Sequence, residues 1–268
     1  MNNLLVRVLT AIVAIPVLLG LLYWAPWWGF FALGIFGVVV AASELAGMTL
    51  KDQRPQQAWA VAASLGIYCL LYFSPTAQVL STTIVGAVAT GFLIGLIAPD
   101  PIETAGARLA WLIVTPLYAG GLLAAIALLH RTPNGGSWVV LSMMLAWLGD
   151  TGAYFAGKGF GKHKLYEKVS PKKTIEGSIG GTLGSVGGAV FMHFTFLPEL
   201  PLLHAVGLGV VASILGQAGD LAVSLVKRSA KVKDSGWIVP GHGGLLDRID
   251  SLVMTGAATW AYTVWFLP

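Results

Sequence analysis

Residues 202–224 read LLHAVGLGVVASILGQAGDLAVS, and this run decides the class of fold. It contains one acidic residue, Asp220, and no lysine or arginine. A helix of 23 residues is about 34 Å long, which is enough to cross the roughly 30 Å hydrocarbon core of a bilayer. The run therefore predicts a membrane-spanning helix that carries a carboxylate in its last turns.

The rest of the chain has the same character. Of its 268 residues 56% are hydrophobic and only 10% are charged, and the mean hydropathy is +0.77. Soluble domains carry roughly 25% charged residues. Further apolar runs lie at about 6–23, 27–47, 58–74, 77–98, 109–130, 137–157, 175–197 and 250–267. The sequence therefore predicts an all-α, polytopic membrane protein with about nine spans, the first of them uncleaved.

The basic residues indicate how these spans are oriented. If the N-terminus lies in the cytoplasm, 15 of the 16 lysines and arginines fall on the cytoplasmic side, and Arg131 alone falls outside. This bias is typical of membrane proteins and explains the net charge of +4 without a nucleic-acid partner. We expect residues 1–135 to form about five N-terminal spans. We expect residues 136–268 to form a second transmembrane region that carries two cytoplasmic basic segments, at about 157–176 and 225–250, and the catalytic candidates described below.

The later basic segment combines both signs of charge. Asp220, Ser224 and Lys227 share one helical stripe, which leads from the apolar run towards the cytoplasm. The stretch PGHGGLLDRID follows at residues 240–250, and its glycines let backbone N–H groups approach a phosphate. A carboxylate at membrane depth is costly unless it is paired or faces water, and a structural ion pair is the plain alternative to a role in chemistry. Carboxylates and cations around an open backbone suit Mg²⁺ bound jointly by protein and substrate phosphates.

The earlier segment, residues 150–177, reads DTGAYFAGKGFGKHKLYEKVSPKKTIEG and has a similar make-up. It begins with Asp150 and contains six lysines between glycines, but it matches neither a P-loop nor a dinucleotide-binding motif. A polybasic loop that binds anionic lipid is the simpler alternative. The glycine-rich stretch 177–190 indicates close helix packing, either within one chain or between the protomers of a homodimer.

These motifs resemble those of the phosphatidate cytidylyltransferase (CDP-diacylglycerol synthase) family. The resemblance rests on Asp150-Thr151-Gly152-Ala153-Tyr154, Ser170-Pro171-Lys172-Lys173-Thr174, Ser224-x-x-Lys227-Arg228, Lys233-Asp234, Pro240-Gly241-His242-Gly243-Gly244 and Asp247-Arg248-x-Asp250. It is specific over residues 150–250 and only general before them. It implies an integral enzyme of the cell membrane that makes CDP-diacylglycerol and pyrophosphate from CTP and phosphatidate at the cytoplasmic face. The implied cofactor is Mg²⁺, as one ion or two.

The residue roles follow from the charges and from this resemblance. The carboxylates expected to bind metal are Asp220, Asp247 and Asp250, with Asp150 a further catalytic candidate. The groups expected to bind substrate phosphates are Lys172, Lys173, Thr174, Lys227, Arg228, Lys233, His242, Gly243, Gly244 and Arg248. Lys227 and Arg248 are also expected to act in catalysis. His242 is expected to position substrate, although its pattern also fits a general base or a loop anchor.

Three other functions fit parts of the pattern. A CTP-dependent lipid or polyprenol kinase would use similar carboxylates and cations but would transfer the γ-phosphate. An organic-anion transporter would explain basic loops and intramembrane carboxylates, yet no internal repeat accompanies them. A lipid-binding scaffold would explain the lysines but not the carboxylates.

Overall fold

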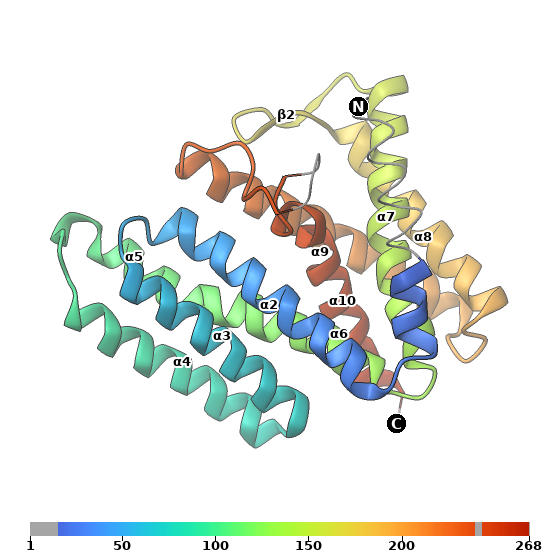
Figure 1. The fold of residues 1–268 in the computed structure, drawn as a ribbon. Coiled ribbons are helices and arrows are strands. Elements are labelled where there is room, and N and C mark those ends of the chain that lie inside the picture. Colours follow the sequence, from blue (N-terminus) through green and yellow to red (C-terminus); the bar gives the residue numbers. More distant parts are fainter. Residues whose placement is uncertain (1–15, 239–242, 268) are drawn as a thin grey trace. The chain divides into compact units, whose positions relative to one another are not determined.

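The computed structural model describes residues 16–238 and 243–267, and its chain folds into two compact units. The first unit comprises residues 1–128 and 230–247, and the second comprises residues 129–229 and 248–268. The described residues 230–238 and 243–247 therefore belong to the same unit as the N-terminal helices, although they lie in the C-terminal half of the sequence. Figure 1 gives the order of the elements along the chain.

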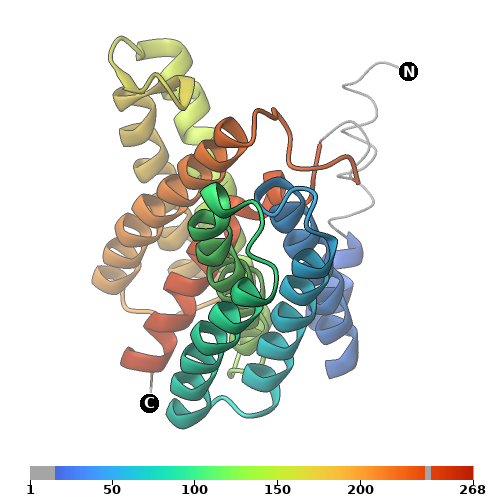
Figure 2. The same ribbon diagram turned by 90° about the vertical axis from the view of Figure 1, so that its left-hand side faces the viewer.

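The first unit is built of helices that lie side by side (Figure 2). They are α2 (Trp27–Thr49), α3 (Arg54–Phe73), α4 (Ala77–Ile97), α5 (Ile102–Thr115), the π-helix η1 (Pro116–Leu122) and most of α6 (Leu123–His130). Their core includes Val38, Tyr68 and Ala124. The Tyr68 hydroxyl is fully buried and donates to the Phe31 carbonyl oxygen at 3.2 Å, so α2 and α3 are joined by a polar contact as well as by packing.

Helices α5, η1 and α6 form one continuous helix, as expected for the apolar run at 109–130. Pro116 has no N–H group to donate to the preceding turn, and the hydrogen-bonding pattern widens at this residue into a π-helix. The same segment brings Gly120 against the Ser64 backbone of α3, where a Cβ atom would overlap the carbonyl oxygen. Tight packing against α3 therefore fixes this helix in the unit.

The second unit consists of α7 (Gly135–Phe160), a β-hairpin, α8 (Ile175–Thr195), α9 (Leu202–Ser229) and α10 (Leu246–Phe266), whose first two residues belong to the first unit. Glycines allow α7 and α8 to touch backbone to backbone. A Cβ atom on Gly152 would overlap the Gly180 carbonyl oxygen, and one on Gly184 would overlap that of Leu148. The glycine-rich stretch thus packs within one chain, and the homodimer stays a prediction.

The all-α membrane fold is confirmed in outline. Among the described residues five helices are long and apolar enough to span a membrane, namely α2, α4, the continuous helix 102–130, α7 and α9. The nine spans and the cytoplasmic N-terminus stay predictions. The basic segment 157–176 also contains a feature that the hydropathy did not predict. It holds an antiparallel hairpin, with β1 (Lys164–Tyr166) paired to β2 (Ser170–Thr174).

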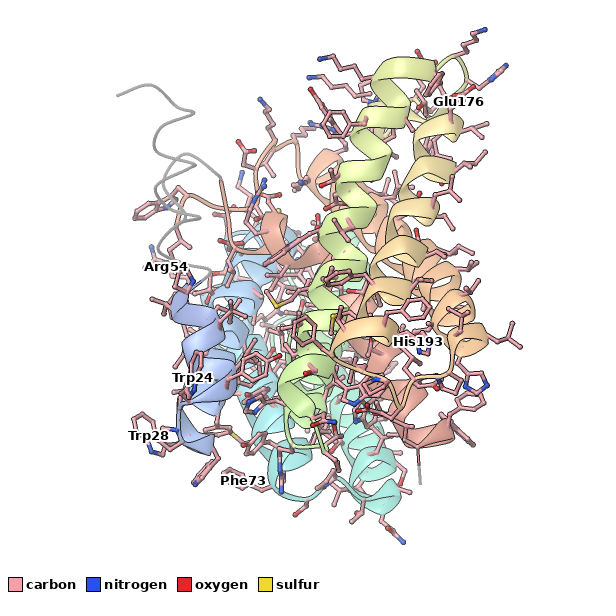
Figure 3. All side chains as sticks on the ribbon, turned by 90° about the vertical axis from the view of Figure 1, so that its right-hand side faces the viewer. Trp24, Trp28, Arg54, Phe73, Glu176 and His193 are labelled. Carbon is pink, nitrogen blue, oxygen red and sulfur yellow. The ribbon has the colours of Figure 1, made fainter. Side chains whose placement is uncertain are left out.

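In the first unit the side chains at the two ends of the helices differ in polarity. In the first unit, Figure 3 shows Trp24, Trp28 and Phe73 near one end and Arg54 near the other. Trp24 is 82% exposed, and aromatic side chains of this kind are typical of a membrane–water interface. The second unit has Glu176 at one end of α8 and His193 near the other. The polar end of α8 adjoins the hairpin, which leads to the candidate site.

Candidate active site

An ion pair between Lys173 and Asp220 joins the basic hairpin to α9 in the second unit. The Lys173 Nζ atom lies 2.6 Å from the Asp220 Oδ2 atom. The Ser224 hydroxyl donates to the other oxygen, Oδ1, at 3.3 Å, because one helical turn separates the two residues. Asp220 and Ser224 therefore lie on one face of α9, as the helical spacing predicts. The side chains of Lys173 and Asp220 are 27% and 29% exposed to solvent, so a ligand can reach the pair.

Two more carboxylates lie within electrostatic range of Asp220. They are Asp150 of α7 and Asp250 of α10, and the three together are called the carboxylate cluster below. Asp250 is buried and accepts a hydrogen bond from the Ser251 backbone N–H at 2.7 Å. Three cations interact electrostatically with carboxylates of this cluster, namely Lys173, Lys227 and Arg248. Six of the residues predicted for the site are therefore brought together from α7, β2, α9 and α10.

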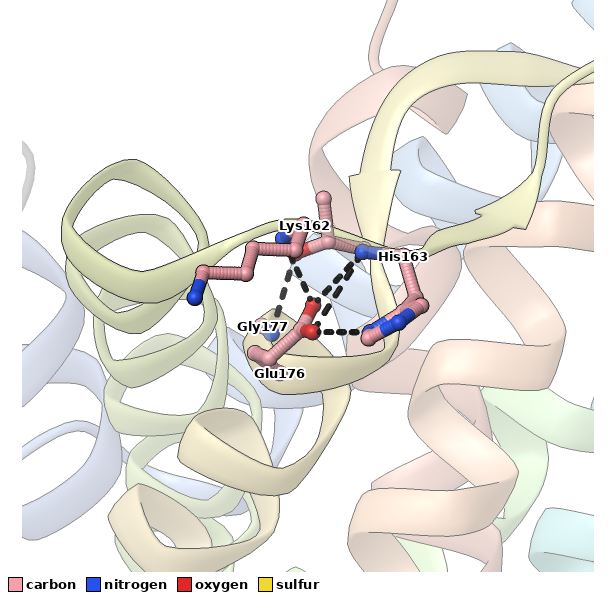
Figure 4. A network of polar contacts seen from close by, with 5 residues as sticks. Lys162, His163, Glu176 and Gly177 are labelled. Atoms are coloured by element: carbon pink, nitrogen blue, oxygen red, sulfur yellow. Dashed lines mark hydrogen bonds and ion pairs between the residues drawn. The ribbon is translucent and has the colours of Figure 1, made fainter.

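The hairpin is fixed to α8 through Glu176. The carboxylate of Glu176 accepts hydrogen bonds from the backbone N–H groups of Lys162 and His163 and lies 2.6 Å from the His163 Nδ1 atom (Figure 4). Its own backbone N–H and the His163 ring, together with these amides, lower the pKa of Glu176 from 4.5 to about 2. The carboxylate is therefore ionised at neutral pH. It holds both ends of the basic segment together.

The loop before α10 is organised around Asp247 in the first unit. The Asp247 Oδ2 atom accepts from the Ser235 backbone N–H at 2.8 Å, the Ser235 hydroxyl at 3.1 Å and the Gly244 N–H at 3.2 Å. Gly243 has a φ of +82°, a conformation that favours glycine. The Gly244 N–H group, predicted to bind phosphate, thus has a carboxylate as its partner in this structure. The roles of Gly243, Gly244 and Asp247 in binding phosphate or metal stay predictions.

The other predicted phosphate-binding residues differ in their surroundings. The Thr174 hydroxyl accepts from the Gly177 N–H at 3.1 Å and caps the N-terminus of α8. Arg228 Nε donates to the Val169 carbonyl oxygen of the hairpin turn at 3.4 Å. The side chains of Lys172 and Lys233 are exposed, and His242 lies outside the described residues. For each of these residues phosphate binding stays a prediction.

Comparison with known proteins identifies the family. A model of the cytidylyltransferase family matches residues 5–266. The chain belongs to this family. It is 45% identical to the phosphatidate cytidylyltransferase of Staphylococcus haemolyticus over 120 residues, which are 45% of this chain and 46% of that protein. The Bacillus subtilis protein of the same name is 42% identical over 120 residues, or 44% of each chain.

A third relative gives a slightly longer match. The phosphatidate cytidylyltransferase of Haemophilus influenzae is 40% identical over 148 residues, which are 53% of this chain and 51% of that protein. The chain thus spans about half the length of the curated relatives it matches. The family resemblance of the motifs is confirmed by these matches.

Metal binding at the carboxylate cluster stays a prediction. Among the described residues, no three histidine, cysteine, aspartate or glutamate side chains come close enough to hold a metal ion by themselves. Mg²⁺ commonly takes only one or two protein carboxylates and completes its shell with substrate phosphates and water. The oxygen donors of the carboxylate cluster, with Asp220 partly exposed, fit such shared binding.

The structure also gives roles to residues that the sequence analysis did not single out. Gln217 lies one turn before Asp220 on α9, and its amide donates to the Ser178 carbonyl oxygen at 3.2 Å and to the Ser213 hydroxyl at 2.9 Å. The bond to Ser178 joins α9 to α8 close to the site, and the Ser178 hydroxyl donates back to Gln217 Oε1, whereas the bond to Ser213 lies within α9. Glu44 of α2 contacts the loop before α10. A sequence signal existed for Glu44, because it is the one charged residue between Trp27 and Thr49.

Proposed function

We propose that this protein transfers the cytidylyl group of CTP to phosphatidate and so forms CDP-diacylglycerol and pyrophosphate. The observation that carries the proposal is the meeting of the carboxylate cluster with Lys173, Lys227 and Arg248. CTP and phosphatidate are both anionic and repel each other, and cations at a fixed position offset that repulsion. The names of the relatives support the same reaction. The apolar helices would place the protein in the membrane, where phosphatidate resides.

The chemistry needs positioning more than proton transfer. A phosphate oxygen of phosphatidate attacks the α-phosphorus of CTP, a new P–O bond forms, and the bond to the β-phosphate oxygen breaks as pyrophosphate leaves. The attacking phosphate is already ionised at neutral pH, so no general base is required. Lys173, Lys227 and Arg248 neutralise charge on the two substrates while the groups are held in line.

Magnesium is the proposed cofactor. Asp220 and Asp250, with Asp150 beside them, are the residues of the second unit that would hold it, and Asp247 is the candidate from the first unit. Bound Mg²⁺ would supply positive charge to the phosphate oxygens of CTP. Lys173 is paired with Asp220 in this structure. If Mg²⁺ bound to Asp220, it would replace Lys173 as the partner of this carboxylate, and Lys173 could then bind a substrate phosphate.

The site is proposed to face the cytoplasm of a cell whose inner membrane holds the protein. The distribution of lysine and arginine supports this orientation. Lys164 is one of the 15 basic residues expected on the cytoplasmic side, and Arg131 is the one expected outside. Single cysteines at positions 164 and 131, in a chain with Cys69 replaced by serine, test the orientation. A membrane-impermeant maleimide added to intact cells should label position 131 only, and labelling of position 164 alone would reverse the proposed topology.

Radiolabelled CTP tests the reaction directly. Purified protein with phosphatidate and Mg²⁺ should transfer label to lipid from α-labelled CTP and none from γ-labelled CTP. Label from the γ-position would indicate a kinase instead, and no label from either would contradict both enzymes. Asp220→Asn should lower incorporation by about 100-fold or more, the order of magnitude lost with one charge-stabilising group. Asp52→Asn, a matched change at an exposed position, should leave it unchanged.

A further inference from the structure

Glu44 lies within an otherwise uncharged helix, yet its carboxylate has three hydrogen-bond donors from the far end of the chain. The Oε1 atom accepts from the Leu245 backbone N–H at 2.9 Å. The Oε2 atom accepts from the Leu246 N–H and from the Ser235 hydroxyl, each at 2.8 Å. The partners are separated from Glu44 by 191 to 202 residues in sequence. A carboxylate placed in an apolar helix is costly without such donors, so these contacts explain why it can reside there.

Glu44 and Asp247 together bind hydrogen-bond donors at Ser235 and at residues 244–246. The Ser235 hydroxyl lies within hydrogen-bond distance of both carboxylates, 2.8 Å from Glu44 and 3.1 Å from Asp247. The Ser235 and Gly244 backbone N–H groups are bound by Asp247, and the next two N–H groups are bound by Glu44. Consecutive backbone donors at residues 244–246 are thus divided between two carboxylates.

The glycines of this loop fit the same arrangement. A Cβ atom on Gly236 or on Gly244 would overlap the Glu44 carboxylate. At Gly236 the closest atom is a Glu44 carboxylate oxygen, and at Gly244 the Ser235 hydroxyl is closest, with the Glu44 carboxylate next. The absence of side chains at these two positions therefore makes room for the Glu44 carboxylate and its contacts.

We infer that Glu44 is a positioning residue for Ser235 and for residues 244–247, where α10 begins. It fixes the first N–H groups of α10 and, through Ser235, the carboxylate of Asp247. The first turns of α10 also carry Arg248 and Asp250. The consequence for turnover rests on the proposed function, whereas the consequence for loop order does not. Helix α2, which lies outside the region of the family motifs, thereby fixes the start of α10 through Glu44.

The test compares Glu44→Gln with Glu103→Gln, a matched change at an exposed residue in the first turn of α5. The first measurement is hydrogen exchange of the amides at residues 244–246 in purified full-length protein. Because glutamine replaces one accepting oxygen by a donor, we expect at least about 10-fold faster exchange in Glu44→Gln and no change in the control. Equal exchange in both variants would overturn the contact.

The second measurement separates positioning from general stability. We expect kcat for label transfer from α-labelled CTP to fall by about 10- to 100-fold, as is usual for residues that orient functional groups, with the thermal midpoint retained. Glu44→Asp, which keeps the charge, should recover part of this loss. Faster exchange with unchanged turnover would overturn the positioning role. If the wild-type protein itself transferred no label, the proposed function would fail, and the exchange result alone would decide the role of Glu44.

A second variant covers the case in which Glu44→Gln does not accumulate. Ser235→Ala removes the hydroxyl shared by the two carboxylates and leaves α2 intact. We expect a smaller rise in exchange at residues 244–246 and a smaller loss of kcat. If Ser235→Ala had the same kcat as the wild type and the same hydrogen exchange at residues 244–246, the positioning role would be contradicted.

Discussion

Replacing Lys173 by methionine should destabilise the second unit, because the change leaves Asp220 without its ion-pair partner. The methionine keeps most of the length and apolar surface of the lysine, so the loss reports mainly on charge. Asp150 and Asp250 lie within electrostatic range of Asp220, and their negative charges add to the cost of removing a cation. Lys227 and Arg248 remain to offset part of that charge.

The size of the effect follows from the geometry of the pair. Two unit charges about 4 Å apart attract each other by about 1 kcal/mol in water and by about 4 kcal/mol at the effective dielectric constant found near protein surfaces. The Lys173 and Asp220 side chains are 27% and 29% exposed, which places them between these limits. We therefore expect a coupling free energy of about 2 kcal/mol between the two side chains.

A double-mutant cycle measures this coupling. Lys173→Met, Asp220→Asn and the double variant are unfolded with sodium dodecyl sulfate in mixed micelles, and the free energies of unfolding are compared. The double variant should lose about 2 kcal/mol less than the sum of the single variants. The same cycle with Lys172→Met, at the exposed neighbouring position, should give a coupling close to zero. A coupling below about 0.5 kcal/mol for Lys173, within the usual additivity of independent sites, would refute the ion pair as a stabilising contact.

Three further predictions concern the elements around the site. Gly184→Leu should force α7 and α8 apart and lower the free energy of unfolding by about 1–3 kcal/mol, whereas Gly187→Leu, with open space at its Cβ position, should have little effect. Because its pKa is held near 2, Glu176 should stabilise the hairpin fully above pH 4.5 and lose this effect as the pH falls towards 2. Its ¹³C-carboxyl resonance should therefore titrate near pH 2, and His163→Ala should raise that midpoint. Gln217→Leu should cost about 1–3 kcal/mol, measured by the same detergent unfolding, because on α8 the Ser178 carbonyl oxygen loses its donor and the Ser178 hydroxyl loses its acceptor.

The helices near the site were predictable because their signal is local. The run 202–224 and its neighbours are apolar over a length that fits a bilayer, and the structure places helix α9 at Leu202–Ser229. The contact of Asp220 with Ser224 was predictable for the same reason, since helical spacing alone brings the two side chains together. The end of a helix was harder to place. The predicted span stops at residue 224, whereas the helix continues through the polar residues Lys227 and Arg228 to Ser229.

Contacts between segments were not predictable in this way. The hairpin at 164–174 is rich in lysine and has little apolar character, so hydropathy gave no sign of its strands. Trp138 has the position of an interfacial aromatic residue at the start of α7, but it is 1% exposed and packs against Tyr262. Exposure of a residue at a helix end depends on which other helix covers it, and that information lies elsewhere in the chain.

By itself the sequence determined the membrane class, the positions of the helices and the residue types that can bind phosphate and metal. These properties depend on neighbouring residues, because hydropathy and helical spacing are read over one or two turns. Tertiary structure decided which charges pair. It placed Lys173 on Asp220 and Glu44 on the loop before α10, across 47 and about 200 residues of chain. Such pairs form only when the fold brings distant segments together, and a partly buried carboxylate is stable only where donors or cations lie within reach.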